Sequence, residues 1–463
     1  MKTGGPLPPT WIVDGKLALI AARGETLGLQ IYQRTPAPTT LAIDGATVRA
    51  FSVQSVKVSR PSTTMYGGSQ GEGEYPEILV ASQVPATSPA YFEIAIARDA
   101  DPGARTGTLS VGAQKIPVTL TIANVTLPPP RLDVWAYFDQ RELAWAAGEA
   151  SQPARAKSRE ASDPERACID LFRAHGVLLS PDLTVDVYQA RKPLLFDFPH
   201  VPVALSDDPA EATTEVKAWI AATKDSGQLP FGIPIDEPGP KRRAEVRALA
   251  DAVHAAGGGP KTFRFAVTDE PRPEYGDAID LYIHWNAARL GDTRERWTYN
   301  GKPPRAGSMV VDTQTPGMRT WGWIAHRYNI PVWYVWDALY WHDRHNNKRK
   351  KIALPGPALD IKRDSVSFDD GEDHGNLDGV LTFAANGRCQ PTLRLAALRR
   401  GLQDRALLEL AAKCHPKETA ELAAKIIPRA LGDAPSEGKP AWPTDEAAWE
   451  AARKQLLELA SCK

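Results

Sequence analysis

Residues 231–240, with the sequence FGIPIDEPGP, join a short apolar run to two neighbouring carboxylates and a proline. The run 231–235 has the composition and length of a buried β-strand. Asp236 and Glu237 stand at its end, and Pro238 cannot continue a strand because it has no N–H. Where the pleat of a strand breaks down, both carboxylates can turn to the same side. The stretch therefore predicts either a solvated strand end or a catalytic pair at the mouth of a barrel.

The chain after residue 130 alternates short apolar runs with amphipathic segments such as 211–223 and 243–256. Strands that alternate with helices predict a (β/α)8 TIM-like barrel, which carries its chemistry at the C-terminal ends of the strands. The link between the second and third runs is too short for a regular crossover helix, so we expect an imperfect barrel. The eight strands are expected at residues 132–138, 177–180, 194–198, 231–235, 262–267, 279–285, 309–311 and 332–336.

The two ends of the chain have different patterns. Residues 1–128 contain alternating apolar and polar runs at 92–96 and 116–122, with Gly and Pro turns between them, which predicts a β-sandwich domain. Prolines 128–130 form a stiff linker to the barrel domain, expected at 131–392. In 393–463 leucines and alanines recur at helical spacing, so we expect C-terminal helices that pack on the barrel. The fold class is thus multidomain β and α/β.

The charge balance argues against several partners. Lys+Arg number 55 against 56 Asp+Glu, so we expect no nucleic acid or anionic membrane partner, and we interpret the basic run 346–351 as a solvated loop. No stretch approaches the ~18 apolar residues of a membrane span. The beginning, MKTGGPLPPTW, lacks the apolar core of a signal peptide. We expect a periplasmic or secreted protein whose leader is absent from this chain, with a cytoplasmic protein as the alternative.

The sequence gives little support for a metal or a cofactor. Four widely spaced cysteines without a CxxC pair argue against the usual zinc motifs. Cys414 and Cys462, both in the helical tail, can pair if the compartment is oxidising. The histidines of HDRH, residues 342–345, do not have the spacing of a zinc-binding helix. The chain contains no P-loop, dinucleotide fingerprint or G-x-S-x-G, so we expect neither a metal nor a cofactor.

The carboxylate pair fits the hydrolysis of a glycosidic bond, which usually requires two carboxyl groups. In the substrate-assisted form the sugar's own 2-acetamido oxygen attacks, and the second carboxylate only orients that group. Adjacent residues can then serve, with Asp236 and Glu237 as the candidates. A second Asp-Glu-Pro occurs at 269–271, but the apolar run and the Gly-Pro turn that flank the first one favour it.

Aromatic and polar residues near other predicted strand ends are suited to a sugar. Aromatic planes stack on the C–H faces of sugar rings, while carboxylates and amides bind hydroxyl groups. For the aromatic residues the alternative is that they fill the barrel core. The expected substrate-binding residues are Tyr137, Trp285, Asn286, Trp297, Tyr299, Asp337 and Trp341.

Segments along nearly the whole chain resemble, in order, glycoside hydrolase family 123, the β-N-acetylgalactosaminidases, and related barrel-domain proteins. Glu77 and residues 104–105 and 383–387 depart from the pattern, and all of these lie outside the carboxylate pair. The resembling segments are EYPEIL (74–79), PGARTGTL (102–109), DEP (236–238), WTY (297–299), RTWGW (319–323), YW (340–341), NLDGVL (376–381) and RLAALRRGLQD (394–404).

The resemblance implies an exo-acting enzyme that releases β-linked N-acetylhexosamine, with N-acetylgalactosamine as the expected sugar, by a retaining, substrate-assisted mechanism. Glu237 would be the general acid and then the base, and Asp236 would hold the acetamido group. Two alternatives stay open: a barrel that binds glycan or has a structural role without hydrolysis, and a hydrolase for another sugar that combines Glu237 with a different carboxylate.

Overall fold

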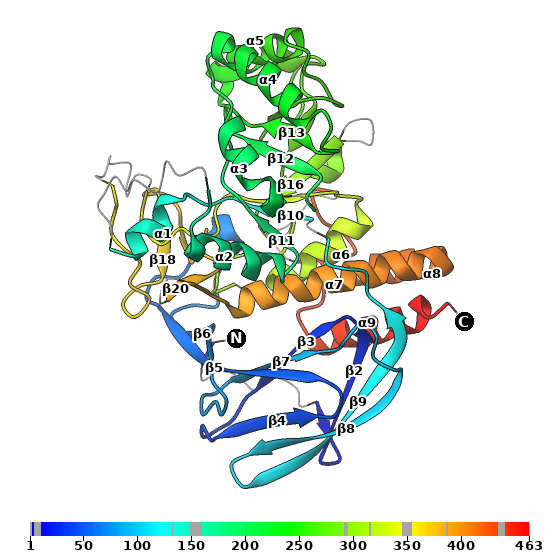
Figure 1. The fold of residues 1–463 in the computed structure, drawn as a ribbon. Helices are drawn as coiled ribbons and strands as arrows, with labels where there is room; N and C mark the ends of the chain where they lie inside the picture. The colour runs from blue at the N-terminus through cyan, green and yellow to red at the C-terminus, as the bar shows by residue number, and fades with distance from the viewer. Residues whose placement is uncertain are drawn as a thin grey trace.

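The structure, a computed structural model, consists of a β-sandwich, a parallel barrel sheet and a group of C-terminal helices (Figure 1). The predicted fold class is confirmed, while the domain boundaries expected after residue 128 and before residue 393 stay predictions. Leu132, His345 and the basic run 346–351 lie outside the described residues. The structure describes residues 2–3, 11–131, 133–148, 160–195, 197–290, 295–313, 316–344, 354–385, 388–433 and 440–462.

The sandwich packs two sheets face to face. Along β9 (Gln114–Thr126) apolar side chains at every second position are buried and the intervening polar ones are exposed, which is the pattern of a strand with one face on a core. One sheet has the order β1 (Ile12–Val13), β2 (Lys16–Arg23), β9, β8 (Gly103–Val111) and β4 (Thr39–Ile43). The other has the order β3 (Thr26–Ile31), β7 (Ala90–Ala95), β5 (Thr47–Val58) and β6 (Gly73–Ala81).

The barrel strands in the described part of the chain form one eight-stranded sheet in which every pair is parallel. Leu183 joins the two edge strands: its N–H donates to the Pro202 carbonyl (3.1 Å) and its carbonyl accepts from the Ala204 N–H (3.0 Å). Around the barrel the strands are β10 (Val134–Ala136), β11 (Val177–Leu179), β12 (His200–Val203), β13 (Leu229–Gly232), β14 (Arg264–Val267), β15 (Leu281–Ile283), β16 (Glu295–Tyr299) and β17 (Trp333–Val335).

Two of the eight expected strands are wrong. Leu194 and Leu195 are the last residues of helix α3 (Val185–Leu195), and the strand at this position of the sheet is β12. Residues 309–311 form a buried loop, and β16 takes that place in the sheet. The link expected to be too short for a helix therefore contains one, α3. The barrel is irregular elsewhere, since among the described residues only the 3₁₀ segments η4 (Pro273–Tyr275) and η5 (Ala287–Leu290) lie between β14 and β15 and between β15 and β16.

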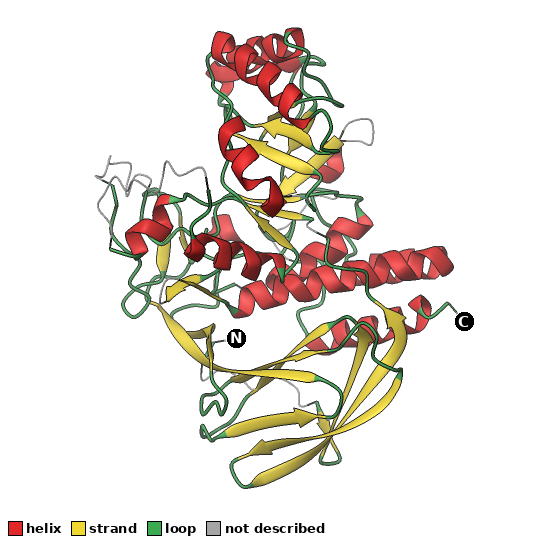
Figure 2. Ribbon diagram, viewed as in Figure 1, coloured by secondary structure: helices red, strands yellow, loops and turns green. Residues whose placement is uncertain are grey.

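Helices and small hairpins complete the structure (Figure 2). The sandwich carries the 3₁₀ turn η1 (Thr64–Tyr66), and the outer helices of the barrel are α1 (Arg141–Ala146), α2 (Asp163–Arg173), α3, α4 (Pro209–Thr223), η3 (Pro240–Arg242), α5 (Arg243–Ala255), η6 (Gly317–Arg319) and α6 (Thr320–Arg327). Two hairpins follow the barrel, β18 (Val366–Asp369) with β19 (His374–Asn376) and β20 (Phe383–Ala385) with β21 (Arg388–Gln390). The chain ends in α7 (Leu393–Cys414), α8 (Pro416–Ile426) and α9 (Glu446–Ala460), as predicted for the tail.

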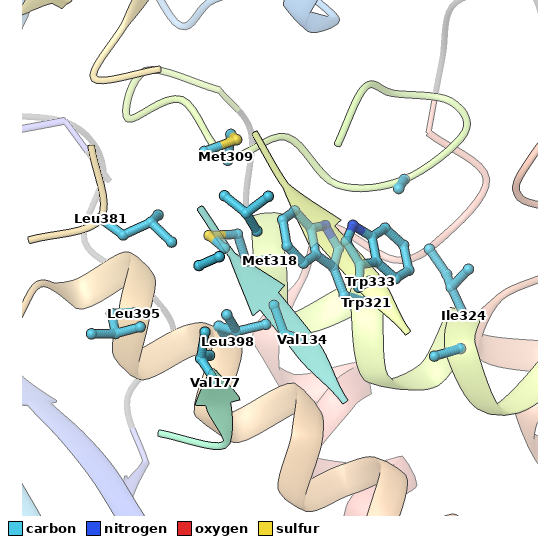
Figure 3. Close-up of a cluster of buried hydrophobic side chains, with 14 of the residues drawn as sticks. Val134, Val177, Met309, Met318, Trp321, Ile324, Trp333, Leu381, Leu395 and Leu398 are labelled. Atoms are coloured by element: carbon cyan, nitrogen blue, oxygen red, sulfur yellow. The ribbon is translucent and has the colours of Figure 1, made fainter. Parts of the chain in front are cut away.

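Helix α7 runs between the barrel and the sandwich (Figure 1). Its Leu395 and Leu398 lie in an apolar cluster with Val134 of β10 and Val177 of β11 (Figure 3). The same cluster contains the stacked pair Trp321 and Trp333. Gly401 permits this packing, because a Cβ there would lie 2.4 Å from the carbonyl oxygen of Arg319. The tail is thus part of the core of the molecule.

Arginines of α7 pair with carboxylates that the sandwich buries. The Arg399 guanidinium donates to Glu93 (2.6 Å), and Arg400 donates to Glu25 (2.6 Å). Glu25 also accepts from Arg453 of α9, and both of these side chains are fully buried. Since an unpaired buried charge is costly, these pairs fix the position of the sandwich on the helical tail.

All four cysteines form disulfides. Cys414 joins Cys462, so the pairing considered from the sequence occurs and ties the end of α7 to the end of α9. A second bond, Cys168 to Cys389, links α2 to the β20–β21 hairpin and was not expected. Disulfides persist mainly in oxidising compartments. Among the described residues, every helix is too short or too polar to cross a bilayer.

We predict that Glu25→Ala destabilises the protein by about 3–5 kcal/mol, because Arg400 and Arg453 then lose a buried partner. Denaturant unfolding of the oxidised protein measures this change in the free energy of unfolding. Glu74→Ala is the matched control: this glutamate is exposed at the start of β6 and should change the free energy by less than about 0.5 kcal/mol. Equal effects of the two substitutions would contradict the role given to the buried pairs.

Candidate active site

The carboxylate pair lies just beyond the C-terminal end of β13. Phe231 points into the barrel and packs edge-on against Trp135 and Trp297, which anchors the strand. Asp236 and Glu237 are exposed to solvent. The backbone at Glu237 is left-handed, with φ of 40°, a conformation that costs an L-residue about 1–3 kcal/mol. The strand end is therefore a built turn that carries two accessible carboxylates.

Thr268 holds this turn in place from the neighbouring strand. Its hydroxyl donates to Asp236 Oδ1 (2.6 Å) and its Oγ1 accepts from the backbone N–H of Glu237 (2.6 Å). Thr268 directly follows β14, so its position is set by the barrel. One hydroxyl thus fixes both members of the pair, and it compensates part of the backbone cost at Glu237.

Several aromatic residues lie close to Glu237. The Tyr299 hydroxyl, from the end of β16, donates to Glu237 Oε1 (2.6 Å). The ring centroid of Trp285 lies 5.3 Å from that of Tyr299. The ring of Tyr334, in the neighbouring strand β17, lies 6.4 Å from the Tyr299 ring. Tyr334 in turn stacks on Trp135 (4.4 Å). Rings at the ends of β15, β16 and β17 therefore give the site flat apolar surfaces beside its carboxylates.

The protein around Glu237 changes its acidity. Partial withdrawal from bulk water raises the pKa of Glu237, the Tyr299 hydrogen bond opposes this, and the negative charge of Asp236 raises the pKa further. The net direction is upward. A general acid must hold its proton at the working pH, so the raised pKa suits Glu237 for proton donation.

A third carboxylate, Asp182, belongs to the same end of the barrel. It follows β11, immediately before the Leu183 bridge that closes the sheet. Its side chain is accessible to solvent, yet protein atoms crowd around it, and this crowding together with the charge of Asp236 raises its pKa to about 7. Near neutral pH this group can therefore be protonated or ionised.

The second Asp-Glu-Pro is placed differently. Asp269 is buried and accepts hydrogen bonds from Arg272 (3.0 Å) and from the Tyr275 hydroxyl (2.7 Å). These bonds outweigh burial and lower the pKa of Asp269. Glu270 is partly exposed and lies 3.4 Å from Arg272. The aspartate of this segment therefore stabilises a turn, which favours the first Asp-Glu-Pro as the reactive one.

The structure brings only some of the expected binding residues to the pair. Tyr299 and Trp285 lie there, and half-buried Tyr137 follows β10 at the same end of the sheet. Trp297 is fully buried, beneath the site, where the Arg264 guanidinium lies over its ring. Trp341 is buried and donates to the Thr382 carbonyl (2.6 Å). Both tryptophans are therefore buried, as the alternative of a core role expects, and a substrate contact by either one stays a prediction.

Two polar candidates have protein partners already. Asp337 is 1% exposed and pairs with Arg344; burial raises its pKa to about 7, although Arg344 opposes the shift. Asn286 Oδ1 accepts from Arg305 Nε (2.6 Å). Neither side chain is directed freely to solvent, so a substrate contact by either one stays a prediction.

Sequence reasoning missed Thr268, Asp182 and Tyr334. Thr268 stands directly before the second Asp-Glu-Pro, so the rule that strand ends carry the chemistry could have found it. Tyr334 lies within a run of aromatic and apolar residues, a composition that predicts a side chain in the core of the barrel. Asp182 has no comparable signal. Among the residues that the structure describes, no group of three or more His, Cys, Asp or Glu side chains could hold a metal ion.

The architecture has a counterpart among solved structures. A family 123 glycoside hydrolase from Clostridium perfringens, which acts on glycolipid glycans, superimposes with a TM-score of 0.60 over 96% of this chain and 93% of its own, at 11% identity. The chain has the fold of a family 123 glycoside hydrolase. The resemblance seen in the sequence is thereby confirmed at the level of the fold.

Other comparisons add little. A β-D-glucuronidase from Dictyoglomus thermophilum matches over 83% of this chain and 68% of its own at 7% identity, but its TM-score of 0.26 supports no argument. No family model and no curated protein matches the sequence. The assignment of roles to individual residues therefore rests on the site itself.

We predict opposite shifts of the Glu237 pKa in two variants. Tyr299→Phe removes a donor that stabilises the carboxylate, so the pKa should rise. Asp236→Asn removes a negative charge but keeps an oxygen for the Thr268 hydroxyl, so the pKa should fall. Titration of the carboxyl carbon by ¹³C NMR measures both. Shifts in the same direction, or none, would show that the two neighbours do not control this group.

Proposed function

We propose that this protein is an exo-acting glycoside hydrolase that releases β-linked N-acetylhexosamine, with N-acetylgalactosamine as the preferred sugar, by a retaining, substrate-assisted mechanism. The observation that carries the proposal is the turn after β13, where Thr268 holds two adjacent accessible carboxylates and the pKa of one is raised. Neighbouring carboxylates suit a reaction in which the substrate supplies the nucleophile.

In the first step Glu237 donates its proton to the glycosidic oxygen as the bond to the anomeric carbon breaks. The acetamido oxygen of the sugar attacks that carbon from the opposite face and forms a cyclic oxazolinium ion. Asp236 accepts a hydrogen bond from the acetamido N–H and stabilises the positive charge that develops there. The hydrogen bond from Thr268 holds Asp236 in one orientation for this task.

In the second step the ionised Glu237 takes a proton from a water molecule, which attacks the anomeric carbon and opens the ring. Two inversions at that carbon retain the β configuration. Tyr299 donates to Glu237 throughout, and this bond is strongest while Glu237 is ionised between the two steps. The hydrogen bond thereby helps Glu237 to give up its proton in the first step.

Sugar recognition is assigned to the surrounding rings. Trp285, Tyr299 and Tyr137, all expected from the sequence, together with Tyr334, offer faces on which a sugar can stack. Trp297 supports this layer from below, and Asp337, Asn286 and Trp341 keep their assignment as binding residues only as a proposal. The glycolipid glycans hydrolysed by the Clostridium perfringens enzyme indicate the substrate class to try first. The disulfides favour a periplasmic or secreted location.

A panel of nitrophenyl β-glycosides tests the proposal. The N-acetyl-β-galactosaminide should be hydrolysed, the glucosamine analogue more slowly, and the plain β-galactoside, which lacks the acetamido nucleophile, should be inert. Brisk turnover of the plain galactoside, or a sugar ester trapped on the protein, would show a protein nucleophile, and Asp182 would be the first residue to examine for it. No turnover of any glycoside or glycolipid glycan would favour a binding or structural role.

We predict that Glu237→Gln lowers kcat/KM on a natural glycan by ~10²–10⁴-fold, because the variant has no proton to donate. Nitrophenyl substrates should lose less in the first step, since their leaving group needs little protonation. Glu270→Gln is the matched control from the second Asp-Glu-Pro and should retain activity within a few-fold. A fully active Glu237→Gln, or an inactive Glu270→Gln, would reverse the assignment.

A further inference from the structure

A small pocket lined by arginines lies beside the proposed active site. It has a volume of about 20 Å³, and its lining includes Arg289, Arg305 and Arg429 together with Asn286 and Gly432. Asn286 and Arg289 belong to the segment after β15, and Arg305 belongs to the loop after β16. The pocket is therefore built at the end of the sheet where Asp236 and Glu237 lie.

The backbone around the pocket is firmly held. The Leu431 N–H donates to the Arg305 carbonyl (2.9 Å), and the Leu431 carbonyl accepts from the Ala288 N–H (3.1 Å). Gly432, with φ of 79°, lets the chain approach closely: a Cβ there would lie 2.7 Å from Asn286 Oδ1 and 3.0 Å from Arg289 Nε. Three segments that are distant in sequence thus converge on one fixed arrangement.

The arginines use only part of their hydrogen-bonding capacity for the fold. Arg289 donates through Nε to the Gly432 carbonyl (2.6 Å), and Arg305 donates through Nε to Asn286 Oδ1 (2.6 Å). Arg429 Nε is buried and has no acceptor. Each guanidinium carries five N–H donors, and the terminal nitrogens of all three make no hydrogen bond to a described residue.

Within the described part of the chain these guanidinium groups also have no carboxylate partner. Among the described residues no carboxylate lies within 4.0 Å of any of the three, as the ion pairs of this part of the chain show. Asp433, next to Gly432, instead accepts from the Tyr328 hydroxyl (2.8 Å) and faces Arg327. The chain carries 56 acidic against 55 basic residues, so carboxylates are not scarce in it. Convergent positive charge that no described carboxylate neutralises points to an anionic ligand.

We propose that Arg289, Arg305 and Arg429 bind an oxyanion, a sulfate ester or a carboxylate, carried by the glycan substrate. The pocket leaves about 20 Å³ for the centre of a water-sized group, which suits one anionic substituent and is far too little for a whole sugar. Guanidinium groups match the geometry of both oxyanions. The preferred substrates are then acidic glycans, an inference that rests on the proposed function.

The connection to the catalytic pair runs through Trp285. This residue directly precedes Asn286 of the pocket, and its ring lies 5.3 Å from that of Tyr299, which donates to Glu237. The ammonium group of Lys302 also lies over the Trp285 ring, 5.4 Å from its centroid. A sugar stacked near Trp285 can therefore direct an acidic substituent to the arginines while its neighbour reaches Glu237.

Titration of the intact protein with sodium sulfate, followed by calorimetry at constant ionic strength, tests the pocket without any need for catalysis. The wild type should bind sulfate, and the double variant Arg289→Gln/Arg429→Gln should bind it at least about tenfold more weakly, because charge-assisted hydrogen bonds are lost. Arg105→Gln, which removes one positive charge from the sandwich strand β8, should bind like the wild type. Failure of the wild type to bind sulfate, or equal binding by the double variant, overturns the proposal.

Kinetics of the wild type distinguish the two oxyanions and do not depend on how the variants fold. Matched oligosaccharides that end in β-linked N-acetylhexosamine are compared in three forms: neutral, with a sulfate ester, and with a carboxylate on the neighbouring sugar. At least one acidic form should have the higher kcat/KM, and free sulfate should inhibit its hydrolysis more than that of the neutral form. If the wild type binds sulfate but does not hydrolyse an acidic form faster than the neutral one, the inference about the substrate is wrong. If the wild type binds sulfate but hydrolyses none of the three forms, the proposed function is wrong instead.

Discussion

Buried charge pairs on helix α7 hold the parts of this molecule together. Arg399 and Arg400 reach carboxylates that the sandwich has withdrawn from water, and Arg453 of α9 reaches one of the same carboxylates. Removal of one partner from such a pair is far more costly than the pair is stabilising, so the arrangement specifies geometry more than it adds stability. The sandwich can dock on the tail in only one way that satisfies these groups.

The same helix also supports the barrel. Arg394, at its first turn, donates to Glu77 of the sandwich (2.7 Å) and to the carbonyl oxygens of Met309, Leu377 and Val380, which lie in the segments after β16 and β19. Arg319 and Trp323 both donate to the buried Asp404 (3.0 Å each). The loops at this side of the barrel are therefore tied to a helix that buried hydrogen bonds hold in place. Because the rest of the barrel is held in place, Thr268 can maintain the strained turn at Glu237.

How far the sequence predicts this structure depends on where each strand lies. The sandwich strands have one buried face, so their alternation is visible, and β9 follows its predicted pattern. Barrel strand β16 was missed because its sequence, ERWTY, begins with a charged residue. Glu295 is accommodated at the bottom of the barrel by an ion pair with Arg264 (2.5 Å), a contact between distant residues that no local pattern reveals. In the other two expected strands, helix and loop packing buries Leu195 and Phe198, and Met309 and Val310, which produces the same composition as a strand.

The candidate site also contains some features that the sequence reveals and others that only the folded chain shows. A carboxylate pair between an apolar run and a proline could be found locally, and so could aromatic residues such as Trp285 and Tyr299. The residues that flank the first Asp-Glu-Pro also favour it over the second. The contacts that separate the two could not be foreseen, because Arg272 and Tyr275 engage Asp269 and Thr268 reaches across to the other pair only in the folded chain. Burial likewise separates Trp297 and Trp341 from the residues at the barrel mouth, and burial is a property of the folded chain.

The central claim is that Asp236 stabilises a nucleophile that belongs to the substrate. It is tested most directly by calorimetric titration with the thiazoline analogue of N-acetylgalactosamine, a stable mimic of the cyclised intermediate. The account predicts that the wild type binds this analogue much more tightly than it binds N-acetylgalactosamine itself, and that Asp236→Asn loses most of this advantage. Equal dissociation constants for the analogue and the free sugar in the wild type would contradict it.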